Sequence, residues 1–316
     1  MSSVFKYLQK IMNWKILIQM TKVSPDEWIP YHQKKADNIL QDFFNQKDNN
    51  SLKNACEYAL LNGGKRLRSL IIYAIGEDES IENKLHLDRL ALSIELIHAY
   101  SLVHDDLPSM DDDALRRGKP SCHIKFNEGQ AILAGDALQS LAFEVLSDND
   151  LDINDSIKVK IINILSRAIG LNGMALGQSI DINTFSNNSS LEVLENLQEL
   201  KTGALIEASC VIPYTLSNNY EEIHKDTMAN IGHYIGKIYQ ITDDILDHES
   251  NTKTLGKTAG KDVRDNKMTY VSHLGIDEAL RIKAHFLEKL KEQISQFPGD
   301  LKVLLNLVNY IYKRDH

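Results

Sequence analysis

The sequence predicts an all-α fold, a single large bundle of helices around a central cavity. Apolar residues recur at the three- and four-residue spacing of a helix surface along most of the chain, and no segment shows the two-residue alternation of a half-buried strand. The 6 prolines and 16 glycines fall between these stretches rather than inside them. With 316 residues, of which 43% are hydrophobic, the chain is long enough to bury a large core.

Seven segments carry the helical pattern most clearly. The first begins at Ser51, expected to be its N-cap, and stops at Gly63-Gly64, where paired glycines favour a helix end. Asn149–Asn154 and Ser186–Ser190 are predicted to be surface turns. The expected helices are Ser51–Leu61, Leu85–Val103, Ala131–Leu146, Ile157–Leu171, Leu191–Leu200, Ile231–Leu246 and Leu301–Tyr312.

The pattern divides the chain into an N-terminal extension, residues 1–25, and one domain, residues 26–316. The first 22 residues contain lysines but no acid, and a variable extension is favoured over an amphipathic targeting helix. No apolar run approaches the roughly 20 residues that span a bilayer, so no transmembrane segment is expected. The three cysteines form neither a zinc motif nor a disulfide framework, which predicts a cytoplasmic protein.

Charge narrows the possible functions. The chain has 44 acidic and 35 basic side chains and a formal net charge of -9. Because nucleic-acid binding needs a basic surface, no nucleic-acid partner is expected. If such an acidic protein binds anionic substrates, metal ions usually have to lie between its carboxylates and the substrate.

Two aspartate clusters point to that metal. The first, Asp105–Asp113, contains Pro108, which disrupts a helix, so the chain can bulge and bring Asp111 back toward Asp105. In the second, Gln240–Asp247, three polar side chains share one helix face where leucine is usual, which predicts that this face lines a wet cavity. The polar residues of that face are Gln240, Asp244 and Asp247.

Magnesium fits these clusters best. Crowded carboxylates repel unless a cation holds them, and Mg2+ takes few protein oxygens and shares its other positions with substrate phosphates. One acidic cluster alone is more often a solvated loop, but two on separate apolar helices favour a metal site. An alternative is that His104-Asp105 is the dyad of a helical metal phosphohydrolase, for which the other histidines lack clear ligand spacing.

Basic residues accompany each acidic element. Gly63–Arg68 joins a helix end to the next apolar run, and glycines beside Lys and Arg at a helix start can form an anion site. His98, two turns before Asp105 on the same helix face, could hydrogen-bond a phosphate bound near the first aspartate cluster, or it could be an ordinary core histidine. The other basic segments are Arg116-Arg117, Lys201–Gly203, Leu255–Lys257 and Asn266-Lys267. Each could be surface charge, but together they favour a diphosphate cradle.

These motifs, in this order from about Lys34 to the C-terminus, resemble the trans-isoprenyl diphosphate synthase family and look closest to its bacterial farnesyl diphosphate synthases. The resemblance rests on seven motifs in register. They are Gly63–Arg68, His98–Asp113, Leu115–Gly118, Gly177-Gln178, Lys201–Gly203, Gln240–Asp247 and Leu255–Lys257. Leu176 and Met268 depart from the usual pattern but replace no charged residue.

The resemblance implies an all-helical homodimer and a polyprenyl synthetase domain over residues 26–316. It also implies an Mg-dependent prenyltransferase that condenses isopentenyl diphosphate with dimethylallyl or geranyl diphosphate to farnesyl diphosphate (C15). Three Mg2+ would be bound per active site with the allylic substrate, held by Asp105, Asp111 and Asp243. Supporting carboxylates would be Asp106, Asp244 and Asp247.

The resemblance also distributes the substrate contacts. Contacts to the allylic diphosphate would come from Arg116, Lys201, Lys257 and Lys267. Isopentenyl diphosphate would be bound by Lys65, Arg68, His98 and Arg117. Thr202 and Gln240 would lie along the developing cation, as part of the catalytic set with the aspartates and Lys201.

Product length depends on the floor of the substrate shaft, which in similar enzymes lies five positions before the first aspartate. Here that residue is Tyr100, whose bulk favours a C15 product, while Ser101 beside it is small and nearer the aspartate face of the helix. A geranylgeranyl diphosphate synthase and a non-catalytic regulatory subunit of the same family remain alternatives. A class I terpene cyclase fits less well, because its second metal motif is normally of Asn/Ser/Glu type.

Overall fold

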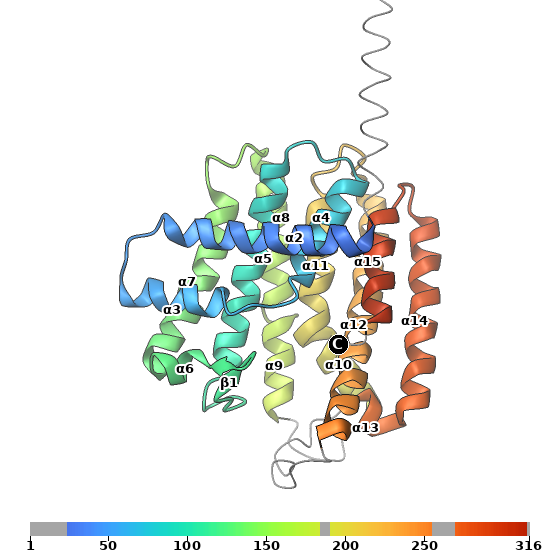
Figure 1. The fold of residues 1–316 in the computed structure, drawn as a ribbon. Helices are drawn as coiled ribbons and strands as arrows, with labels where there is room; N and C mark the ends of the chain where they lie inside the picture. Colours follow the sequence, from blue (N-terminus) through green and yellow to red (C-terminus); the bar gives the residue numbers. More distant parts are fainter. Residues whose placement is uncertain (1–23, 184–189, 255–268, 315–316) are drawn as a thin grey trace, which may run out of the picture.

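The computed structural model describes residues 24–183, 190–254 and 269–314, without side chains for 250–254, and confirms the all-α class (Figure 1). Residues 1–23 of the N-terminal extension lie outside the described residues. Lys257 and Lys267 also lie outside them, and of the expected turn Ser186–Ser190 only Ser190 is described. The longer helices are α2 (Pro25–Asn45), α3 (Ser51–Leu60), α4 (Leu67–Asp78), α5 (Lys84–Asp105), α7 (Glu128–Ser147), α8 (Asp155–Ile169), α9 (Met174–Asn183), α10 (Leu191–Gln198), α11 (Ala204–Tyr214), α12 (Lys225–Thr254), α14 (Ile276–Gln296) and α15 (Lys302–Lys313). Shorter elements are α6 (Cys122–Lys125), α13 (Tyr270–Leu274), the π-helical turn η1 (Glu199–Gly203) and the 3-10 turn η2 (Glu222–His224).

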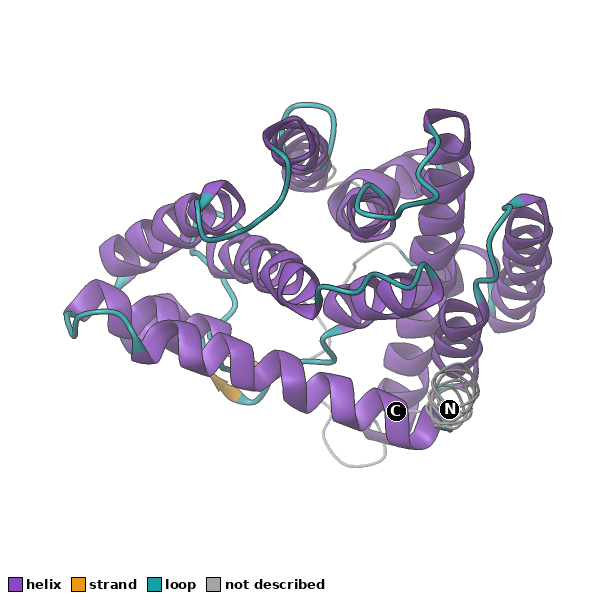
Figure 2. Cartoon of the chain, turned by 90° about the horizontal axis from the view of Figure 1, so that it is seen from above, coloured by secondary structure: helices purple, strands orange, loops and turns teal. Residues whose placement is uncertain are grey.

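Helix α5 lies at the centre of the bundle. It packs against α7 on one side and α4 on another, while α11 packs against α4 and α12, and α12 against α14. In Figure 1, α2 crosses the upper part of the bundle at a steep angle to these helices, and the view from above shows it running along one side (Figure 2). Because α5 is enclosed, it is buried on nearly all sides, from Leu87 to Val103. This burial explains why its sequence is apolar beyond a single stripe.

Two details differ from the sequence prediction. The N-cap of α3 is Asn50, not Ser51, and its side-chain oxygen accepts a hydrogen bond from the Lys53 amide at 2.8 Å. The chain also contains a small hairpin, because Leu115–Arg116 (β1) pairs antiparallel with Lys119–Pro120 (β2). The hairpin turn has positive φ at both Arg117 (54°) and Gly118 (75°), the backbone of a tight two-residue turn.

One helical stretch among the described residues was not anticipated as a membrane candidate. By length and composition alone, Asp155–Asn183 could cross a bilayer, with 28% of its apolar window buried. A turn at residues 170–173 divides it into α8 and α9, and α8 packs against α11. A single stretch of this kind is weak evidence for a membrane span.

Helix α15 is fixed to the rest of the bundle at its first turn. The two carboxylate oxygens of Asp78, the last residue of α4, accept hydrogen bonds from the amides of Val303 and Leu304, both at 2.9 Å. These amides have no partner within their own helix, so Asp78 satisfies them as a cap supplied from another helix. The contact joins the end of α4 to the start of α15.

We expect Asp78→Ala to lower the free energy of unfolding by about 1–2 kcal/mol, because two helix-end amides lose their acceptor. Urea denaturation followed by circular dichroism measures it. Asp300→Ala is the matched control, since that exposed carboxylate pairs with Lys302 on the surface and should change stability little. Equal effects of the two substitutions would contradict the capping role.

Candidate functional site

The first aspartate motif is a loop that turns back on the end of α5. The helix ends at Asp105, and the Asp111 amide donates to the Asp105 carbonyl oxygen at 2.9 Å, as does the Asp113 amide to that of Asp106 at 3.2 Å. The predicted break before Pro108 is therefore confirmed. Asp106 is buried and accepts from Nε of Arg116 at 2.9 Å and from Nη2 of the same guanidinium. The hairpin turn places that guanidinium over the loop.

The second aspartate motif lies on α12 and has two kinds of carboxylate. Asp243 is half-buried, whereas Asp247 is exposed. Asp244 is buried, where its oxygens accept from Gln240 Nε2 and the Tyr270 amide at 2.9 Å and from Gln198 Nε2 at 3.4 Å. The prediction that this whole stripe lines a wet cavity is therefore wrong for Asp244. Its carboxylate fixes the start of α13 and the Gln240 amide instead, because a buried carboxylate needs donors on all sides.

Lys201 connects the first motif to the middle of the chain. Its Nζ lies 3.2 Å from Asp105 Oδ1 and 2.6 Å from Asp181 Oδ2, while Gln178 donates to the same Asp105 oxygen. Lys201 and Thr202 lie in the π-helical turn η1, a rare helix type that occurs frequently at functional sites. The facing carboxylates Asp105, Asp181 and Asp111 raise the pKa of Lys201 against the lowering effect of burial. The ammonium is therefore held charged.

The same helical segment also meets the second motif. Gln198, which contacts Asp244, and Lys201, which contacts Asp105, are one turn apart, roughly 5 Å along the helix. Both aspartate motifs therefore contact this one segment of the chain. The common hollow between them that the sequence interpretation requires stays a prediction.

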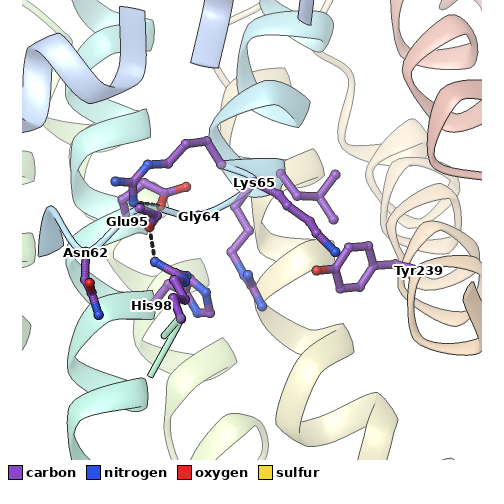
Figure 3. A pocket seen from close by; sticks show the side chains of 11 residues that line it. Asn62, Gly64, Lys65, Glu95, His98 and Tyr239 are labelled. Carbon is purple, nitrogen blue, oxygen red and sulfur yellow. Dashed lines mark hydrogen bonds and ion pairs between the residues drawn. The ribbon is translucent and has the colours of Figure 1, made fainter. Parts of the chain in front are cut away.

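A pocket of about 590 Å³ is lined by the segment before α4, the first turn of α4, the hairpin turn, α5 and α12, and its wall is strongly basic (Figure 3). Figure 3 shows Glu95 and His98 on one side of the pocket and Tyr239 on the other. The charged groups of its wall are Lys65, Arg66, Arg68, Arg117 and Glu95. Four cations against one carboxylate leave an excess of positive charge even though Arg66 is paired with Glu95, and this excess favours an anionic ligand.

The glycine-rich segment shapes this pocket. Gly63 (φ +83°) and Gly64 (φ +133°) adopt backbone that other residues avoid, and a Cβ on Gly64 would lie 2.8 Å from the Arg117 guanidinium. Arg117 donates to the Gly63 carbonyl, and Lys65 Nζ reaches Asp243 Oδ1 at 3.4 Å. The pocket is thus tied to both aspartate motifs, through Arg117 beside Arg116 and through Lys65.

Arg66 is a structural cation rather than a free one. It starts α4 in the left-handed region (φ 51°) and its guanidinium contacts Asp37 at 2.8 Å, Glu95 at 3.1 Å and the Leu60 carbonyl at 3.1 Å. Arg68, in contrast, has its Nε buried with no acceptor among the described residues, and burial lowers its pKa. An unmet buried donor beside a cavity marks a place where a ligand oxygen fits.

His98 is neutral in this surrounding. Burial first, and then Arg68 and Arg117, hold the pKa of its imidazole well below 6.5. A neutral ring can donate one hydrogen bond and accept another, so it adds no charge to the pocket. Its position in the pocket matches the predicted site. The ligand roles predicted from sequence for these side chains stay predictions.

The carboxylates fit a divalent cation, although they are not pre-assembled around one. Within the described ranges no three His, Cys, Asp or Glu groups form a ready metal site. Asp105, Asp106 and Asp243 are instead paired with Lys201, Arg116, Lys65 and Arg314. Separate hard oxygen donors, few on each side, are the set that Mg2+ uses when substrate phosphates complete its coordination.

The proposed chain-length residues lie deeper in the bundle. Tyr100 is buried between α5 and α7, with its ring 5.9 Å from that of His104, and Ser101 donates to the His98 carbonyl. Burial raises the pKa of Tyr100, and a hydrogen bond with Gln139 of α7 opposes that shift. These contacts neither test nor contradict a role in product length.

The sequence interpretation missed three residues of the site. Asp181 pairs with Lys201, Glu95 holds Arg66 and Ser69, and Tyr239 forms one wall of the pocket. A signal existed for two of them. Asp181 follows Gln178 by three residues on one helix face, and Glu95 is a lone acid in the apolar run of α5.

Comparison with known proteins gives a consistent picture. The family model described as polyprenyl synthetase matches residues 49–308. The farnesyl diphosphate synthase of Escherichia coli (strain K12) is 40% identical over 263 residues, covering 82% of this chain and 88% of that protein. Geranylgeranyl pyrophosphate synthase 4 of Arabidopsis thaliana is 40% identical over 275 residues, covering 84% and 72%. The crystal structure of a geranyltransferase from Legionella pneumophila superposes with a TM-score of 0.79 at 31% identity, covering 90% and 96%.

Gly177→Ala should disturb the Lys201 turn. A Cβ at Gly177 would lie 2.3 Å from the Lys201 backbone nitrogen, so α9 and η1 must separate, at a cost of about 1–3 kcal/mol of unfolding free energy. Urea denaturation provides the measurement. Gly129→Ala in the first turn of α7 meets only ordinary contact at 3.5 Å and should be neutral or slightly stabilising. A Gly177→Ala protein as stable as Gly129→Ala would contradict the close approach.

His98 predicts a pH dependence of stability. Below pH 6.5 the unfolded imidazole takes up a proton that the folded site resists, so the wild-type chain loses stability as pH falls through this range. His98→Gln removes this group, and the stability difference, variant minus wild type, should rise between pH 7.5 and pH 5. Denaturation curves at several pH values measure it. A difference that stays constant with pH would show that His98 titrates normally.

Proposed function

The chain belongs to the polyprenyl synthetase family, and from this premise we propose that it is an Mg-dependent trans-prenyltransferase that makes farnesyl diphosphate (C15). The substrates are isopentenyl diphosphate and dimethylallyl or geranyl diphosphate. Relatives of about 40% identity over most of the chain that are named farnesyl diphosphate synthases support the product. One observation carries the chemistry, namely a basic pocket connected to both aspartate motifs, because its Lys65 reaches Asp243 and its Arg117 adjoins the Arg116 that pairs with Asp106.

The two substrates have separate places in this proposal. The basic pocket takes the diphosphate of isopentenyl diphosphate, through Lys65, Arg68, Arg117 and neutral His98. The allylic diphosphate lies between the aspartate motifs, where Lys201 and Arg116 face it. Asp105, Asp111 and Asp243 would hold the Mg2+ ions, three per site, and Mg2+ when bound neutralises the leaving diphosphate.

The reaction follows from these positions. The allylic C–O bond breaks and its electron pair leaves with the diphosphate, whose charge Lys201 and Arg116 help to balance. The double bond of isopentenyl diphosphate then attacks the allylic carbon and forms the new C–C bond. Loss of one proton restores a double bond, so the products are a chain longer by five carbons, inorganic diphosphate and a proton. Thr202 and the Gln240 amide, which Asp244 orients at 2.9 Å, lie beside the developing cation.

The remaining predicted properties are also proposals. We propose a homodimer, which is supported by exposed apolar side chains on adjoining helices, Ile124 of α6 and Ile132 and Leu133 of α7. A cytoplasmic location is supported by the three buried thiols. Residues 1–25 are proposed as an extension outside the catalytic domain of 26–316. Lys257 and Lys267 are proposed to complete the allylic diphosphate site.

The similarity to geranylgeranyl pyrophosphate synthases makes a C20 product the second candidate. Tyr100 favours C15, because a large buried side chain below the first aspartate motif shortens the space for the growing chain. A non-catalytic subunit is disfavoured, because both aspartate motifs are complete.

The decisive assay supplies purified protein with labelled isopentenyl diphosphate and either dimethylallyl or geranyl diphosphate, with and without Mg2+. We expect Mg-dependent formation of a C15 product by chromatography. Asp105→Asn and Asp243→Asn should each lower kcat by about two orders of magnitude or more while the circular dichroism spectrum is retained. Asp150→Asn, in the turn between α7 and α8, is the control. Unchanged turnover in either motif variant would refute the proposal. A C20 product would instead support the second candidate, a geranylgeranyl diphosphate synthase.

A further inference from the structure

The last described residue of the chain reaches into the second aspartate motif. Arg314 follows α15 directly, and its Nη2 forms an ion pair with Oδ1 of Asp243. Only 7% of the Arg314 side chain is exposed, so this is a buried contact rather than a loose surface pair. The same oxygen also faces Lys65 Nζ at 3.4 Å. One carboxylate oxygen is therefore shared by two cations, Lys65 and Arg314, that are far apart in the sequence.

The position of Arg314 is fixed by its helix. The Tyr312 carbonyl accepts a hydrogen bond from Lys283 Nζ of α14 at 3.0 Å, and that ammonium lies 4.5 Å from the centre of the Tyr312 ring. At its other end, α15 is capped by Asp78. Because the helix is held at both ends, Arg314 is delivered to Asp243 by the fold.

Arg314 also touches the wall of the basic pocket. Its guanidinium carbon lies 5.2 Å from the centre of the Tyr239 ring, and Tyr239 lines that pocket. The Arg314 Nε is buried with no hydrogen-bond acceptor among the described residues. Its guanidinium is thus incompletely satisfied, and the contacts that the structure gives it are Asp243 and Tyr239.

We propose that Arg314 is a positioning residue that acts as a built-in counter-ion of Asp243, so that it competes with the divalent cation for this carboxylate. The inference rests on the proposed function, in which Asp243 is a metal ligand. Without metal, Arg314 and Lys65 neutralise this half-buried carboxylate, which reduces the cost of leaving its charge unpaired. When a metal–diphosphate complex enters, Arg314 must give up Asp243 Oδ1.

The competition predicts the direction in which metal affinity changes when the charge of Arg314 is removed. Removing a nearby positive charge lowers the repulsion felt by an incoming dication and frees one ligand oxygen. The substitution Arg314→Gln should therefore tighten metal binding, roughly three- to tenfold. If Arg314 instead gripped the diphosphate or only supported the fold, the same change would weaken binding or leave it unaltered.

The test measures Mn2+ binding to the full chain in saturating inorganic pyrophosphate, by electron paramagnetic resonance of free Mn2+, and needs no turnover. Arg314→Gln is compared with Arg314→Lys, which keeps the charge and should stay near wild type. A second variant, Arg314→Met, keeps the apolar stem beside Tyr239 and should match Arg314→Gln. The control is Arg281→Gln, an exposed arginine paired with Glu278 on α14, which should leave Mn2+ affinity unchanged.

The outcomes separate the two proposals. Tighter Mn2+ binding by both Arg314→Gln and Arg314→Met, with Arg314→Lys near wild type, supports the counter-ion role. Equal or weaker binding by the neutral variants overturns it and leaves the prenyltransferase proposal intact. A wild-type chain that binds no Mn2+ in the presence of pyrophosphate would overturn the proposed function itself.

Discussion

A charge removed from water needs an opposite charge or several hydrogen-bond donors, and this constraint organises the centre of the molecule. Asp105, Asp106 and Asp243 are brought inward by α5 and α12, and each is met by a cation from a different element. The cations come from η1, the hairpin and the end of α15. Because these elements are far apart in sequence, the charge pairs connect the whole bundle around the site.

A few residues with unusual backbone conformation set the direction in which these cationic side chains point. Gly63, Gly64 and Arg66 have positive φ before α4, and Arg117 and Gly118 have positive φ in the hairpin turn. A π-helical turn carries Lys201. At these local deviations from regular helix, the Arg117 side chain reaches the Gly63 carbonyl and the Lys201 side chain reaches Asp105. The buried Arg66–Glu95 pair anchors the segment before α4 to α5.

In the proposed function, the basic pocket and the aspartate motifs are complementary halves of one site. The pocket has an excess of positive charge that favours an anion. The aspartates of the two motifs are instead paired with cationic side chains of the protein itself. A diphosphate in the first and a metal–diphosphate complex in the second would satisfy both. Ion pairs with these side chains, above all with Arg314, stabilise the aspartate charges.

The sequence by itself determined the all-α class, the break after Asp105, the glycine segment before α4 and the family, because helix period, proline and glycine act locally and the motifs are contiguous. It misplaced the N-cap of α3 and missed the hairpin, since two residues of positive φ leave little trace in composition. Tertiary structure alone decided that Asp244 is a buried anchor while Asp243 faces the site, that Asp181 and Glu95 join it, and that Arg314 reaches Asp243. The contacts of the site join residues up to 178 positions apart, as between Lys65 and Asp243. Helix packing sets which side chains meet over such separations, and no local pattern encodes it.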